Sequence, residues 1–334
     1  SIRRQRQMCI RDRFHCLPVM VFIHCIKNYK QRQPMTARYK TGAVQRLADK
    51  GLIKPPTFVA GGTMYETIMG SVAYGVSSDT SDNDVYGFCM PPKDYIFPHL
   101  SGNIPGFSTQ VQSFDQYQQH HIEEKDHRKT WDLNIYSIIK YFRLCMDNNP
   151  NMIDSLFTAE NMLLKQTKIS QMVRDQRREF LHKGSWHKFK GYAFGQMHKM
   201  RIKEPDPSSK RYESIMKYGY DVKFAYHVVR LMDEAEQILI EHDIDLQRNR
   251  EKLKSIRRGE WTMQQIEEHF AEREKTLTTV YAESKLRHSP DEPAITRLLL
   301  SCLEEYYGDL SSAVKVVGVA EDDLRKIKQI VEKW

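Results

Sequence analysis

The chain has 334 residues, of which 40% are hydrophobic and 28% charged, and its net charge is +8. This is the composition of an ordinary folded protein, and no apolar run reaches the roughly 18 residues that a membrane span needs. The six cysteines include no CxxC pair, which argues against a zinc site, and they are too sparse for a disulfide framework. We therefore expect a cytoplasmic protein with reduced thiols and no membrane contact.

The positive charge is concentrated at the start of the chain. Residues 1–34 hold eight Lys/Arg and one Asp, whereas the rest holds 43 basic and 42 acidic side chains. This segment has no period of 2 or 3.6 residues, and its RQRQMCIRDR resembles translated adapter sequence, so Met20 or Met35 is the expected native start. We expect a disordered or non-native basic tail; the alternative is an arm that binds phosphates.

Residues 35–160 are expected to form a small α/β domain, because short apolar segments alternate there with turn-rich stretches. Strands are predicted at 63–69, 85–90 and 132–136. The polar, Gln- and His-rich residues 93–131 are interpreted as an irregular excursion between strands. From Ser137 the apolar period becomes that of a helix, which ends near Asn-Pro-Asn.

Residues 161–334 are expected to form an all-helical domain, because strand signals fade and apolar residues recur at helical spacing. The helical stretches lie at 163–181, 188–201, 221–240, 260–284 and 293–310.

The most informative stretch is GSVAYGVSSDTSDNDVYGF, which starts at Gly70. In a strand, Asp82 and Asp84 would point to the same side about 7 Å apart. Two such carboxylates repel unless a cation lies between them, and Mg²⁺ is often shared between one or two carboxylates and substrate phosphates. Gly70 and Ser71, at the end of the preceding strand, could present backbone N–H groups and a hydroxyl to phosphate. The alternative is a polar surface turn that leads into a strand.

This arrangement resembles the nucleotidyltransferase superfamily of DNA polymerase β, whose hallmark is GS, a short helix, DxD and a later third carboxylate, here Asp132. GSxAYG, SDxDxxG, the following Pro-Pro and the Asn-Pro-Asn at 149–151 resemble more closely the bacterial and phage branch associated with RNA-repair ligases. The resemblance covers roughly residues 60–300. Asp154 stands where that branch usually has a Glu, which is a departure.

The resemblance implies an α+β fold, in which a polymerase-β-like domain with a mixed sheet precedes the helical domain. It implies that Asp82, Asp84 and Asp132 are catalytic and hold two Mg²⁺ ions, with Mn²⁺ as a substitute. The reaction would move an NMP from an NTP to an acceptor hydroxyl and release pyrophosphate. An RNA end, a protein hydroxyl and a small molecule stay open as acceptors, and the base preference and oligomeric state are not encoded visibly. The rival class is an inactive nucleotide- or RNA-binding protein of the same fold.

Further basic residues lie on predicted helices. Lys223, His227 and Arg230 share one helix face and, with Gly70 and Ser71, are the expected substrate-binding residues; a stripe paired with acids elsewhere is the alternative. Lys188, Tyr192 and Lys199, which also share one helix face, could form a second wall of the site. The alternative is that this face is simply exposed to solvent. A metal site at His120 and His121 is not expected, because adjacent His residues rarely converge on one ion.

Overall fold

The computed structural model describes residues 41–77, 81–101, 113–127, 129–201, 207–208 and 211–308. All of them belong to one compact unit. The expectations for residues 1–34 lie outside the described residues. Within the described ranges no helix is long and apolar enough to cross a membrane.

Five strands form one mixed sheet, in the order β3-β4-β2-β1-β5. The central strands β2 and β4 run parallel, and the other neighbouring pairs are antiparallel. The strands predicted at 63–69, 85–90 and 132–136 are confirmed as β1, β2 and β4. The strands are β1 (Thr63–Ile68), β2 (Asn83–Cys89), β3 (Gln116–Glu124), β4 (Lys129–Ser137) and β5 (Leu163–Gln166).

Two strands were not expected. The stretch interpreted as an irregular excursion contains β3, an edge strand whose outer face is exposed and polar, so the alternation that marks a half-buried strand is weak. Only a few side chains, including Tyr117 and Ile122, pack against the core. The stretch 163–181, expected to be helical throughout, begins with β5, which pairs with β1. Helix α8 starts only after Thr167, which forms a capping box with Ser170.

The helices predicted in the second half are confirmed as α9, α11, α13 and α14, and α6 follows β4 directly, capped by Ser137. Asp221 caps α11, since its carboxylate accepts the backbone N–H groups of Lys223 and Phe224. The described helices are α2 (Ala43–Asp49), α3 (Thr57–Gly62), α4 (Gly70–Ala73), α5 (Lys93–Ile96), α6 (Ile138–Met146), α7 (Pro150–Phe157), α8 (Lys168–Asp175), α9 (Gly184–Met200), α10 (Tyr212–Tyr218), α11 (Val222–Glu241), α12 (Arg250–Arg257), α13 (Met263–Glu283) and α14 (Glu292–Tyr307).

The two faces of the sheet pack into different cores. On one face, α2 and α3 cover Val85, Trp131 and Leu133. On the other face, Phe88 belongs to a large core that continues through α6, α7 and α8 into α9, α11 and α13. Side chains alternate along a strand. Asp132, which lies between Trp131 and Leu133, and Asp84, which precedes Val85, therefore point toward this second, helix-rich side.

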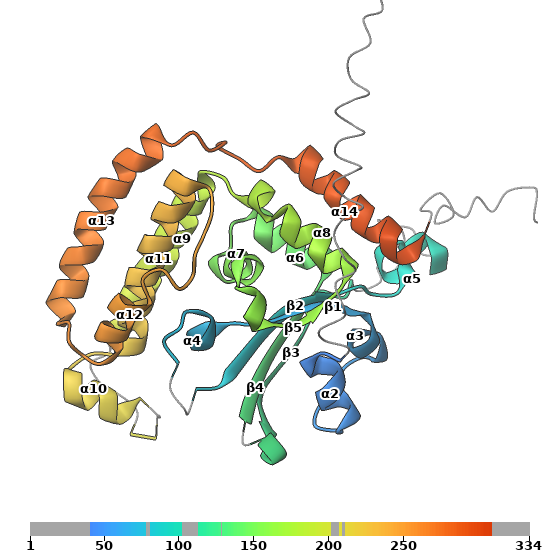
Figure 1. Cartoon of the computed structure of the whole chain (residues 1–334), viewed down its shortest axis with the longest axis horizontal. Helices are drawn as coiled ribbons and strands as arrows, with labels where there is room; N and C mark the ends of the chain where they lie inside the picture. Colours follow the sequence, from blue (N-terminus) through green and yellow to red (C-terminus); the bar gives the residue numbers. More distant parts are fainter. Residues whose placement is uncertain are drawn as a thin grey trace, which may run out of the picture. The chain divides into compact units, whose positions relative to one another are not determined.

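Part of the predicted helical domain packs against the sheet. Figure 1 shows α9, α11, α12 and α13 gathered on one side of the picture, whereas α14 returns to lie beside α8 over the sheet. Both β5 and α8 follow residue 160 and contact β1. The division into domains at 35–160 and 161–334 stays a prediction, but the sheet and the helices share one continuous core.

Candidate active site

The centre of the candidate site is a pair of carboxylates on the two parallel strands. Asp84 of β2 and Asp132 of β4 are direct partners in the register, and Asn83 pairs with Trp131 in the same way. Neighbouring strands are about 4.8 Å apart, and both carboxylates lie on the sheet face turned toward the helices. Burial, followed by the charge of Asp132, raises the pKa of Asp84.

Gly70 brings the start of α4 against this pair. Its φ is +64°, and a Cβ at this position would lie 2.0 Å from Oδ2 of Asp84. The N–H of Met69 also donates to the carbonyl of Asp84, at 2.7 Å. No other residue type would leave this space for the Asp84 carboxylate, so the Gly-Ser turn and the acidic strand fit each other closely.

A cavity of about 370 Å³ opens in front of the carboxylates. It brings together seven of the eight residues that the sequence predicts for the site and adds others from distant parts of the chain. Its lining comprises Met69, Gly70, Ser71, Tyr74, Ser81, Asp82, Asp84, Tyr86, Asp132, Asn151, Arg211, Lys223, Tyr226, His227 and Arg257.

The cavity has an acidic wall and a basic wall. Asp82 and Asp132 both raise the pKa of Asp84, whereas the charge of Lys223 lowers it. Arg211 and Arg257 line the same cavity, and their charges act on His227 together with that of Lys223, so we call these three cations the basic wall and the three carboxylates the acidic wall. A ligand that carries several negative charges and a divalent cation would complement both walls at once.

His227 is a neutral group within this basic wall. Burial lowers its pKa well below the ordinary value, and the nearby Arg and Lys charges lower it further. Its buried Nδ1 atom has no hydrogen-bond partner among the residues that the structure describes, while the side chain lines the cavity. His227 can therefore donate or accept one hydrogen bond toward a ligand without adding charge.

The three carboxylates fit a hard cation such as Mg²⁺, which prefers oxygen ligands. Among the described residues, no hydrogen bond or ion pair reaches the Asp84 carboxylate, and a cation would stabilise its charged form against burial and the charges of Asp132 and Asp82, which raise its pKa. Across those same residues, no three His, Cys, Asp or Glu side chains are already close enough together to hold a metal alone. Mg²⁺ usually retains waters and shares substrate phosphates, so an incomplete protein set is compatible with it.

Asp132 is also fixed by the edge strand. One carboxylate oxygen accepts the backbone N–H of His121 at 2.7 Å, and Nδ1 of His120 lies 3.4 Å from the other. A bulge at His121, where φ is +54°, turns this N–H toward Asp132. The backbone of His121 and the imidazole of His120 thus support the third carboxylate, and the two imidazole ring centroids are 6.3 Å apart.

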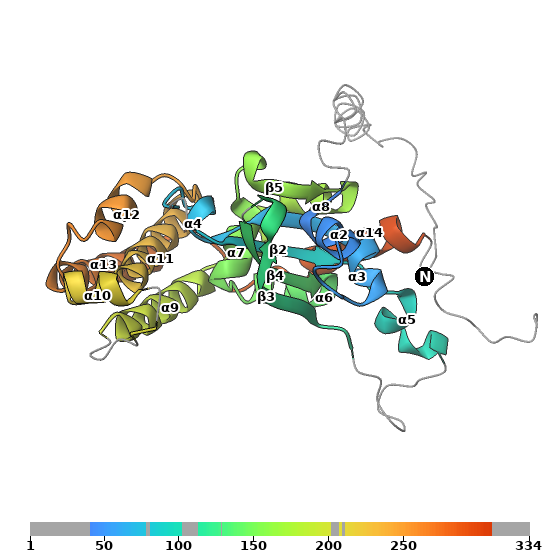
Figure 2. The ribbon, with the colours of Figure 1, turned by 90° about the horizontal axis from the view of Figure 1, so that it is seen from below.

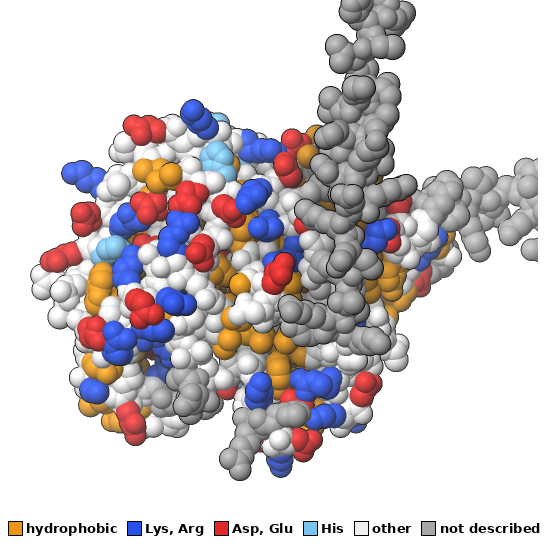
Figure 3. All heavy atoms as spheres, in the orientation of Figure 1, with side chains coloured by type: hydrophobic (Ala, Val, Ile, Leu, Met, Phe, Trp, Pro, Cys, Tyr) orange, Lys and Arg blue, Asp and Glu red, His pale blue; other side chains and the backbone are white. Residues whose placement is uncertain are grey.

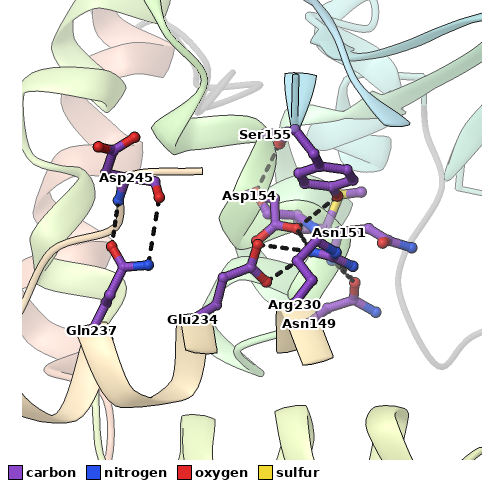
Figure 4. Close-up of polar contacts among 10 residues, drawn as sticks. Asn149, Asn151, Asp154, Ser155, Arg230, Glu234, Gln237 and Asp245 are labelled. Carbon is purple, nitrogen blue, oxygen red and sulfur yellow. Dashed lines mark hydrogen bonds and ion pairs between the residues drawn. The ribbon is translucent and has the colours of Figure 1, made fainter. Parts of the chain in front are cut away.

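Arg230 corrects one sequence prediction. It does not line the cavity but is buried beneath it, where its guanidinium bonds to Asp154 and Glu234 and lies 4.1 Å from the ring centre of Tyr74. Figure 4 shows Arg230 between these two acids. Lys223 and Arg230 share one face of α11, but Lys223 is exposed whereas Arg230 is buried in the core. Arg230 is therefore paired with acids, which is the alternative considered in the sequence analysis.

The same network accounts for Asp154, which departs from the expected Glu. Its Oδ2 accepts a hydrogen bond from the Tyr74 hydroxyl at 2.8 Å as well as from Arg230. Tyr74 follows α4 directly, so the network joins the Gly-Ser helix to α7 and α11. At the start of α7, Asn149 caps the helix and Asn151 lines the cavity.

The loop after α4 is held from a second side. Gln247 donates to the carbonyl of Ala73 at 3.1 Å, and Arg257 donates to the carbonyl of Val76. Gly75 takes φ +66° and packs against Arg250 and Gln247. No sequence pattern pointed to Gln247 or Arg257, because their role depends on long-range contacts that local patterns do not reveal.

A fold with paired acids on a mixed sheet beside a Gly-Ser turn defines the polymerase-β-like nucleotidyltransferases. The sequence profile of RlaP, the RNA repair pathway DNA polymerase beta family, matches residues 57–301. The chain therefore belongs to this family, which confirms the resemblance and the predicted α+β fold.

Comparisons with curated sequences and with solved structures add no further evidence on function. No curated protein sequence matches the chain. A crystal structure of a nucleotidyltransferase-like protein from Exiguobacterium sibiricum 255-15 is similar with 9% identity and a TM-score of 0.26, over 79% of each chain.

Proposed function

We propose that the protein is a Mg²⁺-dependent nucleotidyltransferase, with Mn²⁺ as a substitute, that moves an NMP from an NTP to an acceptor hydroxyl. The observation that carries this proposal is the in-register pair Asp84 and Asp132, against which Gly70 places the Gly-Ser turn. The presence of an acidic wall and a basic wall around one cavity favours a substrate that is itself anionic and metal-bound.

The roles follow from position. Asp82, Asp84 and Asp132 would hold the metal ions, which when bound lower the pKa of an attacking hydroxyl and stabilise a departing pyrophosphate. Ser71, Lys223 and the nearby arginines would bind the triphosphate, since hydrogen bonds between charged groups are short and strong. His227 would add a neutral hydrogen bond at the same ligand.

The reaction would be a single displacement. The acceptor oxygen forms a bond to the α-phosphorus as the bond from that phosphorus to the bridging oxygen of the β-phosphate breaks. The acceptor thereby gains an NMP, and pyrophosphate leaves. The hydroxyl proton passes to the carboxylate of Asp132, which faces the cavity and is held in place by the backbone N–H of His121.

The rival is a protein that binds nucleotide or RNA without transfer. Such a binder would not need three carboxylates at one cavity, because each adds repulsion toward phosphate. The family name, with its reference to RNA repair, supports an RNA end as one acceptor to examine first.

The test is incubation with each labelled NTP, Mg²⁺ and a panel of RNA ends. We expect one NTP or more to label an acceptor and release pyrophosphate, and Asp84→Asn to abolish this. Asp126→Asn is the matched control, because Asp126 is an exposed carboxylate paired with Lys50 and lies outside the cavity lining. Nucleotide binding with no labelled product from any acceptor would favour the rival.

A further inference from the structure

Helix α9 carries charge of one sign only. Its 17 residues, GSWHKFKGYAFGQMHKM, include three Lys and two His and no acid. Lys190 pairs with Glu274, but Lys188 has no ion pair with any described residue. On the face of the molecule drawn in Figure 3, in contrast, Lys and Arg are interspersed with Asp and Glu.

One face of α9 is exposed to solvent and contains two glycines. At 3.6 residues per turn, the residues that share this face are Lys188, Gly191, Tyr192, Gly195 and Lys199, and all are exposed or half-exposed. A Cβ on Gly191 or Gly195 would meet nothing within 4 Å. Glycine is unfavourable inside a helix compared with alanine, so packing within the described chain does not explain these two glycines.

This face is continuous with the candidate active site. The Tyr192 hydroxyl accepts a hydrogen bond from the Asn149 side chain at 2.9 Å, and Asn149 in turn accepts the backbone N–H of Asn151 at 3.1 Å. Asn151 lines the cavity. Figure 2 shows the first turns of α9 beside α7, the helix that these asparagines begin.

Two tyrosines of the sheet extend the face toward the carboxylates. Tyr86 lines the cavity, and its ring centre is 6.4 Å from that of Tyr136. Burial raises the pKa of Tyr136, and the nearby Tyr192 raises it further. Three tyrosines from β2, β4 and α9 thus lie near one another, between the open α9 face and the acidic wall.

We infer that the α9 face (Lys188, Gly191, Tyr192, Gly195 and Lys199), together with Tyr86 and Tyr136, binds the acceptor, and that the acceptor is the single-stranded end of a nucleic acid. Lysines attract a phosphate backbone, tyrosines stack on unpaired bases, and glycines let a bulky chain approach the helix closely. This inference rests on the proposed function for the meaning of acceptor, but the binding itself does not depend on transfer.

The test is the affinity of the full chain for a fluorescent single-stranded RNA 12-mer at several salt concentrations. We expect Tyr192→Ala to weaken binding about tenfold or more, and Lys188→Gln to reduce the salt slope by about 0.7. Gly191→Ala and Gly195→Ala should raise the melting temperature yet weaken RNA binding, which a purely structural role would not do. Lys275→Gln, an exposed lysine on α13, is the matched control and should change neither.

The outcomes separate this inference from the proposed function. If α9 variants lose RNA affinity while Mg-NTP, for the NTP that stabilises the parent most, still stabilises them as it does the parent, the inference holds even in a protein that transfers nothing. Transfer that proceeds with unchanged RNA affinity and unchanged KM for RNA in the α9 variants overturns the inference alone. So does a parent chain that fails to bind the 12-mer, including one that instead labels a polypeptide.

Discussion

Asp84 and Asp132 are direct neighbours across the parallel strands β2 and β4. Their proximity has an energetic consequence, because burial and the charge of Asp132 together raise the pKa of Asp84. The folded protein therefore holds two carboxylates that would be more stable apart or with a cation between them. A pair of this kind is costly for the fold and useful for a metal-dependent site.

The acidic residues should matter for ligand binding and not for folding. Asp82→Asn and Asp84→Asn each remove repulsion and keep the side-chain shape, so the metal-free variants should melt at or slightly above the parent temperature. Mg-NTP at about a hundred times its Kd should stabilise the parent by about 2.7 kcal/mol, and this gain should vanish in both variants. Thermal melts with and without Mg-NTP measure both effects. A large loss of metal-free stability with the Mg-NTP gain intact would make the pair a structural cap.

Gly70→Ala should abolish Mg-NTP binding. The added Cβ would lie 2.0 Å from the Asp84 carboxylate and force it to move. The left-handed backbone itself should cost about 1–2 kcal/mol. Gly51→Ala is the matched control, since Gly51 has φ +70° with nothing within 4 Å. Both variants should lose this much stability, and Gly70→Ala should lose more because of the clash. Calorimetric titration with Mg-NTP should show binding only in the control; equal binding in both would contradict the close fit of Gly70 to Asp84.

The two cations of α11 should respond in opposite ways. Arg230→Ala leaves Asp154 and Glu234 buried without their partner, which should cost about 3–5 kcal/mol in the free energy of unfolding. Lys223→Gln alters an exposed side chain at the cavity, so stability should hold while Mg-NTP affinity falls about tenfold. Urea unfolding and nucleotide titration distinguish the cases. A stable Arg230→Ala variant with weakened nucleotide binding would return Arg230 to the substrate site.

Glu66 should make stability depend on pH. It is fully buried on β1, accepts the N–H of Ala43, and burial raises its pKa to about 7. An acid whose pKa is higher in the folded state stabilises the fold at low pH, and this contribution is lost as pH rises from the unfolded value toward 7. Relative to Glu66→Gln, the parent should lose roughly 3 kcal/mol between pH 4.5 and pH 8. Urea unfolding curves that are parallel in pH for the two proteins would contradict the raised pKa.

Local sequence patterns predicted much of the fold and the three carboxylates of the site. Period changes located β1, β2, β4 and the long helices, and the Gly-Ser and Asp-x-Asp spacing located the carboxylates. The edge strand β3 was missed because its exposed face is polar and its backbone partner is β4, which no local pattern reveals. Arg230 was misplaced because helix periodicity identifies a face but not the depth at which that face enters the core.

The most direct test of the account is to measure transfer and nucleotide binding together in Asp132→Asn. The account predicts that labelled NMP transfer to an acceptor falls at least about a hundredfold, because the attacking hydroxyl loses its proton acceptor and one metal ligand. Mg-NTP binding should persist in part, since Asp82, Asp84 and the basic wall stay in place. A transfer rate within a few-fold of that of the parent would contradict the catalytic role of Asp132. It would also contradict the proposal that Asp84 and Asp132 form the catalytic centre.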